Sequence, residues 1–238
     1  MVEHGGAPHT VHRRAVRAMR RKTVLGAIVR SKVGIIMFLP AGDIRWAKGW
    51  LMIVVFVALT IPSMVYMWRV NPEIFAARRR IQPGTKGWDR VLLMVLLPTM
   101  LAIYPVAALD DGRFHWSRVP LWLVVVGYLL LTTSWCLFMW VESVNKFAEP
   151  GVRVHAEQKV IDTGPYAIVR HPMYMGVPSF SVGTALALGS YWALVPAALL
   201  LPILVGRTAM EDRTLREELG GYKQYASRVR YRLLPGVW

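Results

Sequence analysis

The sequence contains little cysteine and little charge. One of its 238 residues is a cysteine, Cys136, and 18% are charged, against ~25% in a typical soluble domain. A single cysteine excludes a disulfide framework within the chain and a zinc site built on cysteines. No two of the six histidines have metal-ligand spacing, so we expect no metal site. Hydrophobic residues make up 55% and the mean hydropathy is +0.37, a balance that favours a bilayer protein.

The sequence also lacks the motifs of nucleotide-binding folds and of common hydrolases. It has no Gly-x-Gly-x-x-Gly run, no Walker-type loop, no His-Glu-x-x-His and no Gly-x-Ser-x-Gly. Any chemistry must therefore come from its polar segments, which are residues 69–90, 142–171 and 206–238.

What the sequence has in abundance is long apolar runs. Residues 50–68, 91–109 and 119–141 are uncharged and match the ~20 residues that a membrane-spanning helix needs. Trp50 and Trp68 end the first run, as aromatic residues do at membrane interfaces. We therefore expect an all-α fold, a polytopic bundle of about six spanning helices.

The last apolar run is too long for one helix. Residues 177–205 carry no charge over 29 positions, and Gly189 and Ser190 lie near the middle. A tight turn there predicts a helical hairpin over 172–206, the alternative being one strongly tilted helix.

The first span is less regular. Residues 23–40 are apolar but interrupted by Arg30, Ser31 and Lys32. A spanning helix is favoured, and a helix lying in the membrane interface is the alternative. The chain then divides into a basic tail (1–22), four spanning helices (23–141) and a region of cofactor loop, hairpin and tail helix (142–238).

Basic residues gather in alternate connecting segments. The formal charge is +15, and the four segments 1–22, 69–90, 142–171 and 206–238 hold six, six, four and seven lysines and arginines. These 23 residues compare with four in the other connections, so the positive-inside rule places both termini in the cytoplasm. Because the charge is spread over four inner segments, we expect the lipid bilayer and not nucleic acid as partner. The oligomeric state stays open.

One polar segment combines a turn, a helix start and two aromatic residues. Gly164-Pro165 predicts a turn, and Pro172 suits the first position of a helix. Arg170 and His171 would then stand beside free N–H groups and the positive helix pole, a place for a carboxylate or phosphate. Loop contacts with lipid head groups are the alternative.

Two further groups of polar residues follow apolar runs. In the tail, Arg207, Glu211 and Glu218 share one helical face, where a helix lying on the bilayer would be the alternative reading. Glu142 and Asn145 lie one turn apart after the third strong run and are candidate substrate contacts, unless they only form a solvated helix end.

The spacing of these motifs resembles a known family. The chain is similar to the isoprenylcysteine carboxyl methyltransferases, integral-membrane enzymes, and to their bacterial branch in particular. The matching segments are Thr163-Gly164-Pro165-Tyr166, Val169-Arg170-His171-Pro172-Met173-Tyr174-Met175-Gly176, Glu211-Asp212, Gly221-Tyr222 and Leu234-Pro235. Asp212 departs from the usual Glu but keeps the carboxylate.

The resemblance implies a methyltransferase that uses S-adenosylmethionine at the cytoplasmic face of the bacterial inner membrane. The matching cofactor-binding residues are Tyr166, His171, Pro172, Tyr174 and Glu211. The methyl donor's carboxylate suits His171 and the helix start, and its cations suit Glu211 and the tyrosine faces. Arg170 or Arg207 could steady an anionic acceptor as catalytic groups.

The acceptor would be lipophilic and would approach from the bilayer. An isoprenylcysteine-like carboxylate, a lipid amine, a quinone-like phenol or a small thiol are all compatible with the sequence. Two alternatives remain open: a membrane reductase of the sterol-reductase type that uses NADPH, and a non-enzymatic membrane protein on the same scaffold.

The charge distribution makes a topology prediction. With six spans and both termini in the cytoplasm, a reporter enzyme fused after Trp238 should be active only on the inner side of the membrane. Activity confined to the outer side would contradict this topology. The first span is its weakest part, because Arg30 and Lys32 interrupt the run.

Overall fold

The chain folds into a bundle of helices. The computed structural model describes residues 34–238, and within that range it contains no strand. The all-α prediction is therefore confirmed. The predicted tail 1–22 and most of the span predicted at 23–40 lie outside the described residues. Residues 34–41, at the end of that span, are helical.

Among residues 34–238, four helices are long and apolar enough to cross a membrane, so the chain is an integral membrane protein. They are α2 (Ala47–Val70), α4 (Gly87–Ala107) with its π-helical continuation η1 (Ala108–Phe114), α5 (Leu121–Val144) and α7 (Leu194–Glu218). They cover the three predicted runs and the second arm of the hairpin. The first arm, α6 (Pro172–Ala187), has 16 residues. The predicted total of six spans stays a prediction.

The long last run is divided as its Gly-Ser pair predicts. Helix α6 ends at Ala187, Gly189 takes a positive φ of 79°, and α7 begins at Leu194. Glycine adopts this left-handed conformation without the penalty that a Cβ would bring. Ser190 Oγ accepts a hydrogen bond from the N–H of Ala193 at 3.0 Å, just before α7. The hairpin is confirmed, and the single tilted helix is wrong.

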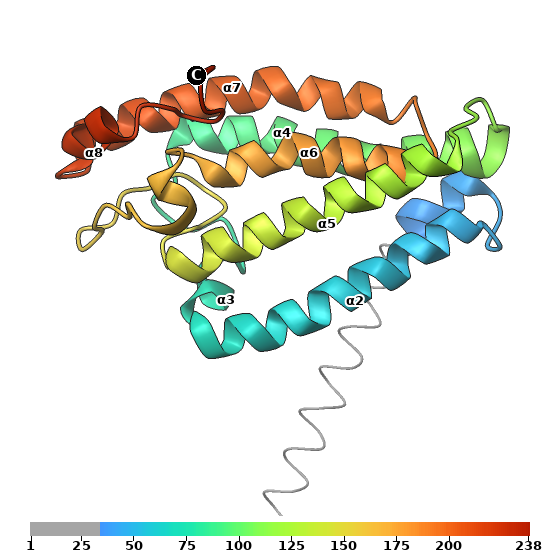
Figure 1. The fold of residues 1–238 in the computed structure, drawn as a ribbon, viewed down its shortest axis with the longest axis horizontal. Helices are drawn as coiled ribbons and strands as arrows, with labels where there is room; N and C mark the ends of the chain where they lie inside the picture. The colour runs from blue at the N-terminus through green and yellow to red at the C-terminus, as the bar shows by residue number, and fades with distance from the viewer. Residues whose placement is uncertain (1–33) are drawn as a thin grey trace, which may run out of the picture.

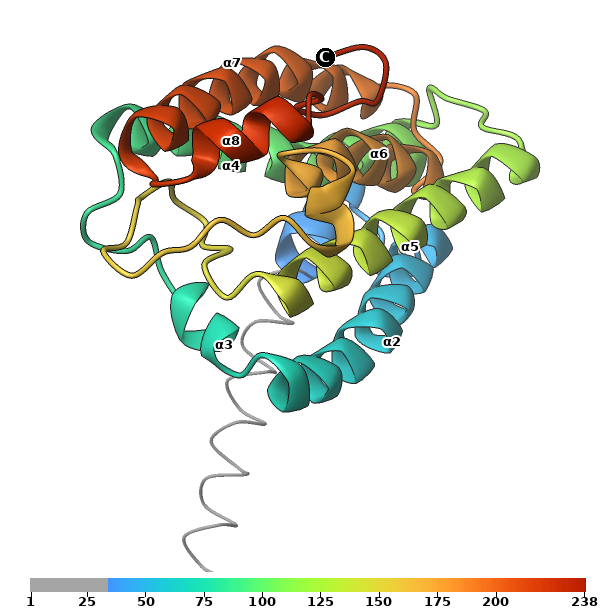
Figure 2. The same cartoon turned by 60° about the vertical axis from the view of Figure 1, so that its left-hand side comes forward.

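The polar segments meet at one end of the bundle. In Figures 1 and 2, α3 (Glu73–Ala77), the loop after α5 and α8 (Tyr222–Arg228) lie at the same end of the bundle, far from the α6–α7 turn. Hydrogen bonds join them: Lys86 N–H to Val152 O at 2.9 Å, and Arg170 N–H to Tyr231 O at 3.0 Å. The three polar segments thus face the same side, as the alternation of basic residues predicts.

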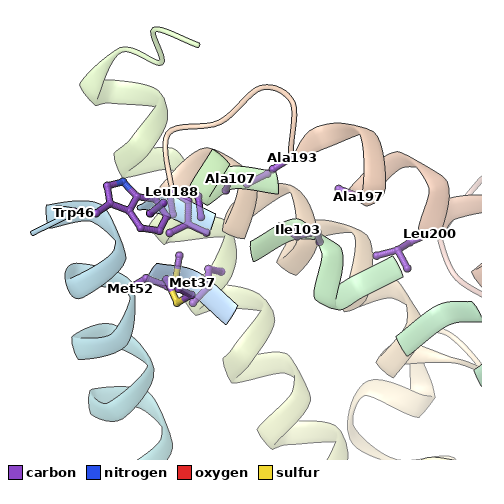
Figure 3. Close-up of a cluster of buried hydrophobic side chains, with 14 of the residues drawn as sticks. Met37, Trp46, Met52, Ile103, Ala107, Leu188, Ala193, Ala197 and Leu200 are labelled. Atoms are coloured by element: carbon purple, nitrogen blue, oxygen red, sulfur yellow. The ribbon is translucent and has the colours of Figure 1, made fainter. Parts of the chain in front are cut away.

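The opposite end is closed by apolar packing and one buried acid. Figure 3 shows that the residues filling it come from several elements: Met37, Trp46, Met52, Ile103, Ala107, Leu188, Ala193, Ala197 and Leu200. At this end the Asp110 carboxylate accepts hydrogen bonds from Ser117 Oγ at 2.6 Å and from Ser190 Oγ at 2.5 Å. A buried acid with all its partners present fixes η1 to the α6–α7 turn.

Two glycines let α5 and α6 approach closely. A Cβ on Gly127 would clash with the backbone of Gly183 and Ala187, and a Cβ on Gly183 would clash with the backbone of Leu131. Small residues at a crossing allow this approach between membrane helices. The crossing holds α6 in place and thereby positions its first residues at the polar end.

Gly127→Ala should destabilise the protein. The added methyl group meets backbone atoms that cannot rotate away, and overpacking of this kind costs about 1–3 kcal/mol. Gly206→Ala on α7 is the matched control, since nothing lies within 4 Å of its Cβ position. Thermal unfolding in detergent should show a lower midpoint for the Gly127 variant alone. Equal midpoints would contradict the close crossing.

Candidate functional site

A cavity opens at the polar end of the bundle. Its volume is about 370 Å³, within the ~300–1,000 Å³ that is usual for ligand sites. Its walls come from α4, α5, α6, α7 and the loop of residues 147–161. All nine residues predicted from the sequence line it: Glu142, Asn145, Tyr166, Arg170, His171, Pro172, Tyr174, Arg207 and Glu211.

The cavity has an apolar part within the bundle. Leu93, Leu96 and Met100 of α4 line it, together with side chains of the three neighbouring helices, which are Phe138, Phe180 and Leu204. The remaining walls are the polar loops and the polar ends of the helices. One cavity therefore offers both a polar region at the end of the bundle and an apolar region among the helices.

The start of α6 and the middle of α7 form a compact polar cluster. Tyr174 donates a hydrogen bond to Glu211 Oε2 at 2.5 Å, and His171 Nδ1 lies 3.9 Å from Glu211 Oε1. The rings of His171 and Tyr174 are parallel, with centroids 5.9 Å apart. Pro172 occupies the first position of α6, as expected, and so directs His171 and Tyr174 toward α7.

Arg170 is bound within the protein. Its Nε donates to Asp212 Oδ1 at 2.7 Å, and its Nη1 donates to the carbonyls of Val229 and Arg230 at 2.8 and 2.7 Å. With these donors engaged, the guanidinium joins the tail to α6 and α7. The sequence suggested a catalytic role for Arg170, whereas this geometry is that of an anchor for the site.

Arg207 is paired in the same way. Its Nε and Nη2 donate to the two carboxylate oxygens of Asp89 at 2.7 and 3.2 Å, and Nη2 also donates to Pro150 O at 2.6 Å. Asp89 is completely buried and accepts a further bond from Val152 N–H at 2.7 Å. The pair therefore fixes the 147–161 loop to the bundle. The guanidinium also lies 4.9 Å from the centre of the Tyr174 ring, so a cation already contacts that aromatic face.

The predicted substrate contacts lie at the end of α5. Glu142 Oε1 lies 3.0 Å from Nη1 of Arg78, and Asn145 Nδ2 donates to the Tyr166 hydroxyl at 2.7 Å. Burial raises the pKa of Tyr166 to about 12, so its phenol stays protonated at neutral pH. Arg78 is a cavity residue that the sequence did not single out.

Asp212 and Tyr222 also received no role from the sequence. Asp212 contacts Arg170, Arg216 and Arg232, and Tyr222 donates to its Oδ1 at 3.0 Å. Burial, and then the charge of Asp212, raises the pKa of Tyr222, which keeps this phenol protonated. Both residues stand next to Glu211 and Gly221 within the matching motifs, and this position was the sequence signal that could have identified them as site residues.

The comparisons with known proteins agree with this geometry. Residues 122–221 match the family model of the phospholipid methyltransferases. That family includes the isoprenylcysteine carboxyl methyltransferases, so the resemblance to them found in the sequence is confirmed, while their bacterial branch stays a prediction. The match covers 100 of the 238 residues, from α5 to the start of α8, and gives no support to the reductase alternative. A search of curated proteins finds no match.

The Asp89–Arg207 pair makes a stability prediction. Asp89→Asn leaves the Arg207 charge buried without its counter-charge, and breaking a buried pair costs roughly 3–5 kcal/mol. Asp162→Asn is the control, because Asp162 pairs with Arg228 at an exposed position, where such pairs contribute ~0–1 kcal/mol. Denaturant unfolding in detergent measures both. Similar midpoints for the two variants would show that the buried pair does not hold the loop.

Proposed function

We propose that this membrane methyltransferase moves a methyl group from S-adenosylmethionine to a lipophilic acceptor. The observation that carries the proposal is the cluster of His171, Tyr174 and Glu211 at the polar side of a cavity that continues into the apolar bundle. The family of residues 122–221 supports methyl transfer in general.

The residues of the cavity fit the methyl donor. S-adenosylmethionine carries an ammonium group, a sulfonium, a carboxylate and an aromatic base. Glu211 supplies a carboxylate for the cations, and His171, Tyr174 and Tyr166 supply ring and hydrogen-bonding surfaces. Pro172 shapes the helix start between them.

The residues of the chain orient the two reactants and exclude water from the cavity. When bound, S-adenosylmethionine supplies an activated methyl group that an acceptor takes by in-line displacement. Alignment of the two reactants lowers the entropic part of the barrier, and exclusion of water strengthens the electrostatic contacts. The Asp89–Arg207 pair holds the 147–161 loop against the cavity, and Arg170 holds the tail beside it.

The apolar part of the cavity suits an acceptor that stays in the bilayer. Leu93, Met100 and Phe180 offer no hydrogen bonds and would contact a hydrocarbon chain. Glu142 and Asn145 would then meet the acceptor's polar group. The polar end, with its basic segments, would face the cytoplasm at a bacterial inner membrane.

Purified protein and labelled methyl donor test the proposal directly. The protein is incubated with methyl-labelled S-adenosylmethionine and a membrane lipid extract, and the labelled product is identified. Transfer of label to a lipid-soluble product is expected. Donor photolabelling that excess NADPH abolishes, together with no label transfer, would contradict the methyltransferase assignment.

The Glu211→Gln variant tests whether Glu211 binds the methyl donor or only lies on a solvated helix face. If Glu211 pairs with the cationic methyl donor, the amide keeps the shape but removes the charge. Donor binding should then weaken by about 2–5 kcal/mol. Glu218→Gln is the control two turns further along α7. Its carboxylate binds Lys86 at 2.6 Å and lies outside the cavity. Calorimetry measures both affinities in detergent, and equal values would remove Glu211 from the site.

A further inference from the structure

The two ring nitrogens of His171 have different surroundings. Nε2 lies 3.6 Å from Asp212 Oδ1 and 3.5 Å from the Tyr222 hydroxyl oxygen. Nδ1 lies 3.9 Å from Glu211 Oε1, at the cavity. The imidazole is buried between two neighbouring carboxylates of α7, one deep in the protein and one lining the cavity.

Both neighbours of Nε2 are hydrogen-bond acceptors toward it. A carboxylate has only lone pairs to offer, and Tyr222 uses its hydrogen in the 3.0 Å bond to Asp212 Oδ1. The Tyr222 oxygen therefore presents a lone pair to the imidazole. A nitrogen that faces two acceptors carries the hydrogen, and in a neutral ring the other nitrogen then accepts.

The Asp212 carboxylate is held rigidly in this orientation. It binds Nε of Arg170 at 2.7 Å, Nε of Arg216 at 3.0 Å and Nε of Arg232 at 3.2 Å. The three arginines come from the start of α6, from α7 and from the tail. A buried carboxylate with three cationic partners stays ionised and has no freedom to turn away from the histidine.

We infer that Asp212 and Tyr222 are positioning residues that fix the hydrogen of His171 on Nε2 and leave Nδ1 as an acceptor beside Glu211. The inference rests on the proposed function for the identity of the ligand. Nδ1 and Glu211 Oε1 then form a pair of acceptors at the cavity wall. Such a pair binds a cationic N–H group, the α-ammonium of the methyl donor, and repels its carboxylate. This reverses the role that the sequence suggested for His171.

The ring nitrogens can be observed directly. Full-length protein labelled with ¹⁵N-histidine in detergent should show hydrogen on Nε2 of His171 and none on Nδ1. His171→Gln identifies the signals by removing them. Hydrogen on Nδ1 alone, or on both nitrogens, overturns the inference. This measurement needs no methyl donor, so it stands even if the proposed function fails.

Asp212→Asn should reverse the tautomer. Three arginine nitrogens contact Oδ2 and one, Arg170 Nε, contacts Oδ1, so the amide oxygen should take the Oδ2 side and the amide nitrogen should face His171. The N–H then donates to Nε2 and moves the hydrogen to Nδ1, as an Asp-to-Asn change does beside other histidines. We expect a donor affinity at least tenfold weaker. The control Glu217→Gln, an exposed carboxylate on the same helix, should change neither measurement.

Tyr222→Phe provides a second variant if Asp212→Asn does not fold. It keeps the buried ring and removes one of the two acceptors at Nε2, so the share of the other tautomer should rise and donor affinity should fall severalfold. Unchanged ¹⁵N signals in a folded variant of either residue would contradict the positioning role. If neither variant folds, the ¹⁵N spectrum of the wild-type protein still shows which nitrogen of His171 carries the hydrogen.

The decarboxylated methyl donor tests the ammonium assignment. It keeps the ammonium and sulfonium groups and lacks the carboxylate. His171→Gln should weaken its binding by the same factor as that of S-adenosylmethionine. A loss confined to the donor that carries the carboxylate would overturn the assignment. If wild-type protein binds neither compound, the proposed function fails while the tautomer result remains valid.

Discussion

The structure depends on the burial of two aspartates, each against arginine, at one end of an apolar bundle. Asp89 pairs with Arg207, and Asp212 pairs with Arg170. A buried charge is tolerated only when a counter-charge and hydrogen bonds replace its water. Helices, loop and tail must therefore meet in one arrangement to satisfy the four groups, and the cavity is the space enclosed by that arrangement.

The two ends of the bundle use buried acids differently. At the closed end, Asp110 is satisfied by serine hydroxyls and backbone N–H groups, with apolar side chains packed below it. At the polar end, the two aspartates pair with arginines, and Glu211 and His171 lie at the cavity wall. The buried acid at the closed end thus has neutral partners, and the buried acids at the polar end have ionic partners that surround the site.

The sequence was informative wherever the signal is local. Apolar runs of sufficient length predicted α2, α4, α5 and α7, and Gly189-Ser190 predicted the hairpin, because length and backbone freedom are properties of neighbouring residues. The candidate residues came from motif spacing, and they line one cavity. The sequence could not reveal that Arg207 binds Asp89. These residues are 118 positions apart, and their pairing follows from the packing of α4 against α7.

The short length of α6 has a consequence for the depth of the site. Its 16 residues span about 24 Å, less than the ~30 Å of hydrocarbon in a bilayer. Helices α6 and α7 leave the same turn, and His171 meets α7 at Glu211 and Asp212, well before that helix ends at Glu218. His171 and Glu211 therefore lie in a recess that stops short of the end of α7. In the proposed reaction, a water-soluble methyl donor would descend into the recess, while an acceptor with an acyl chain would reach it without leaving the lipid.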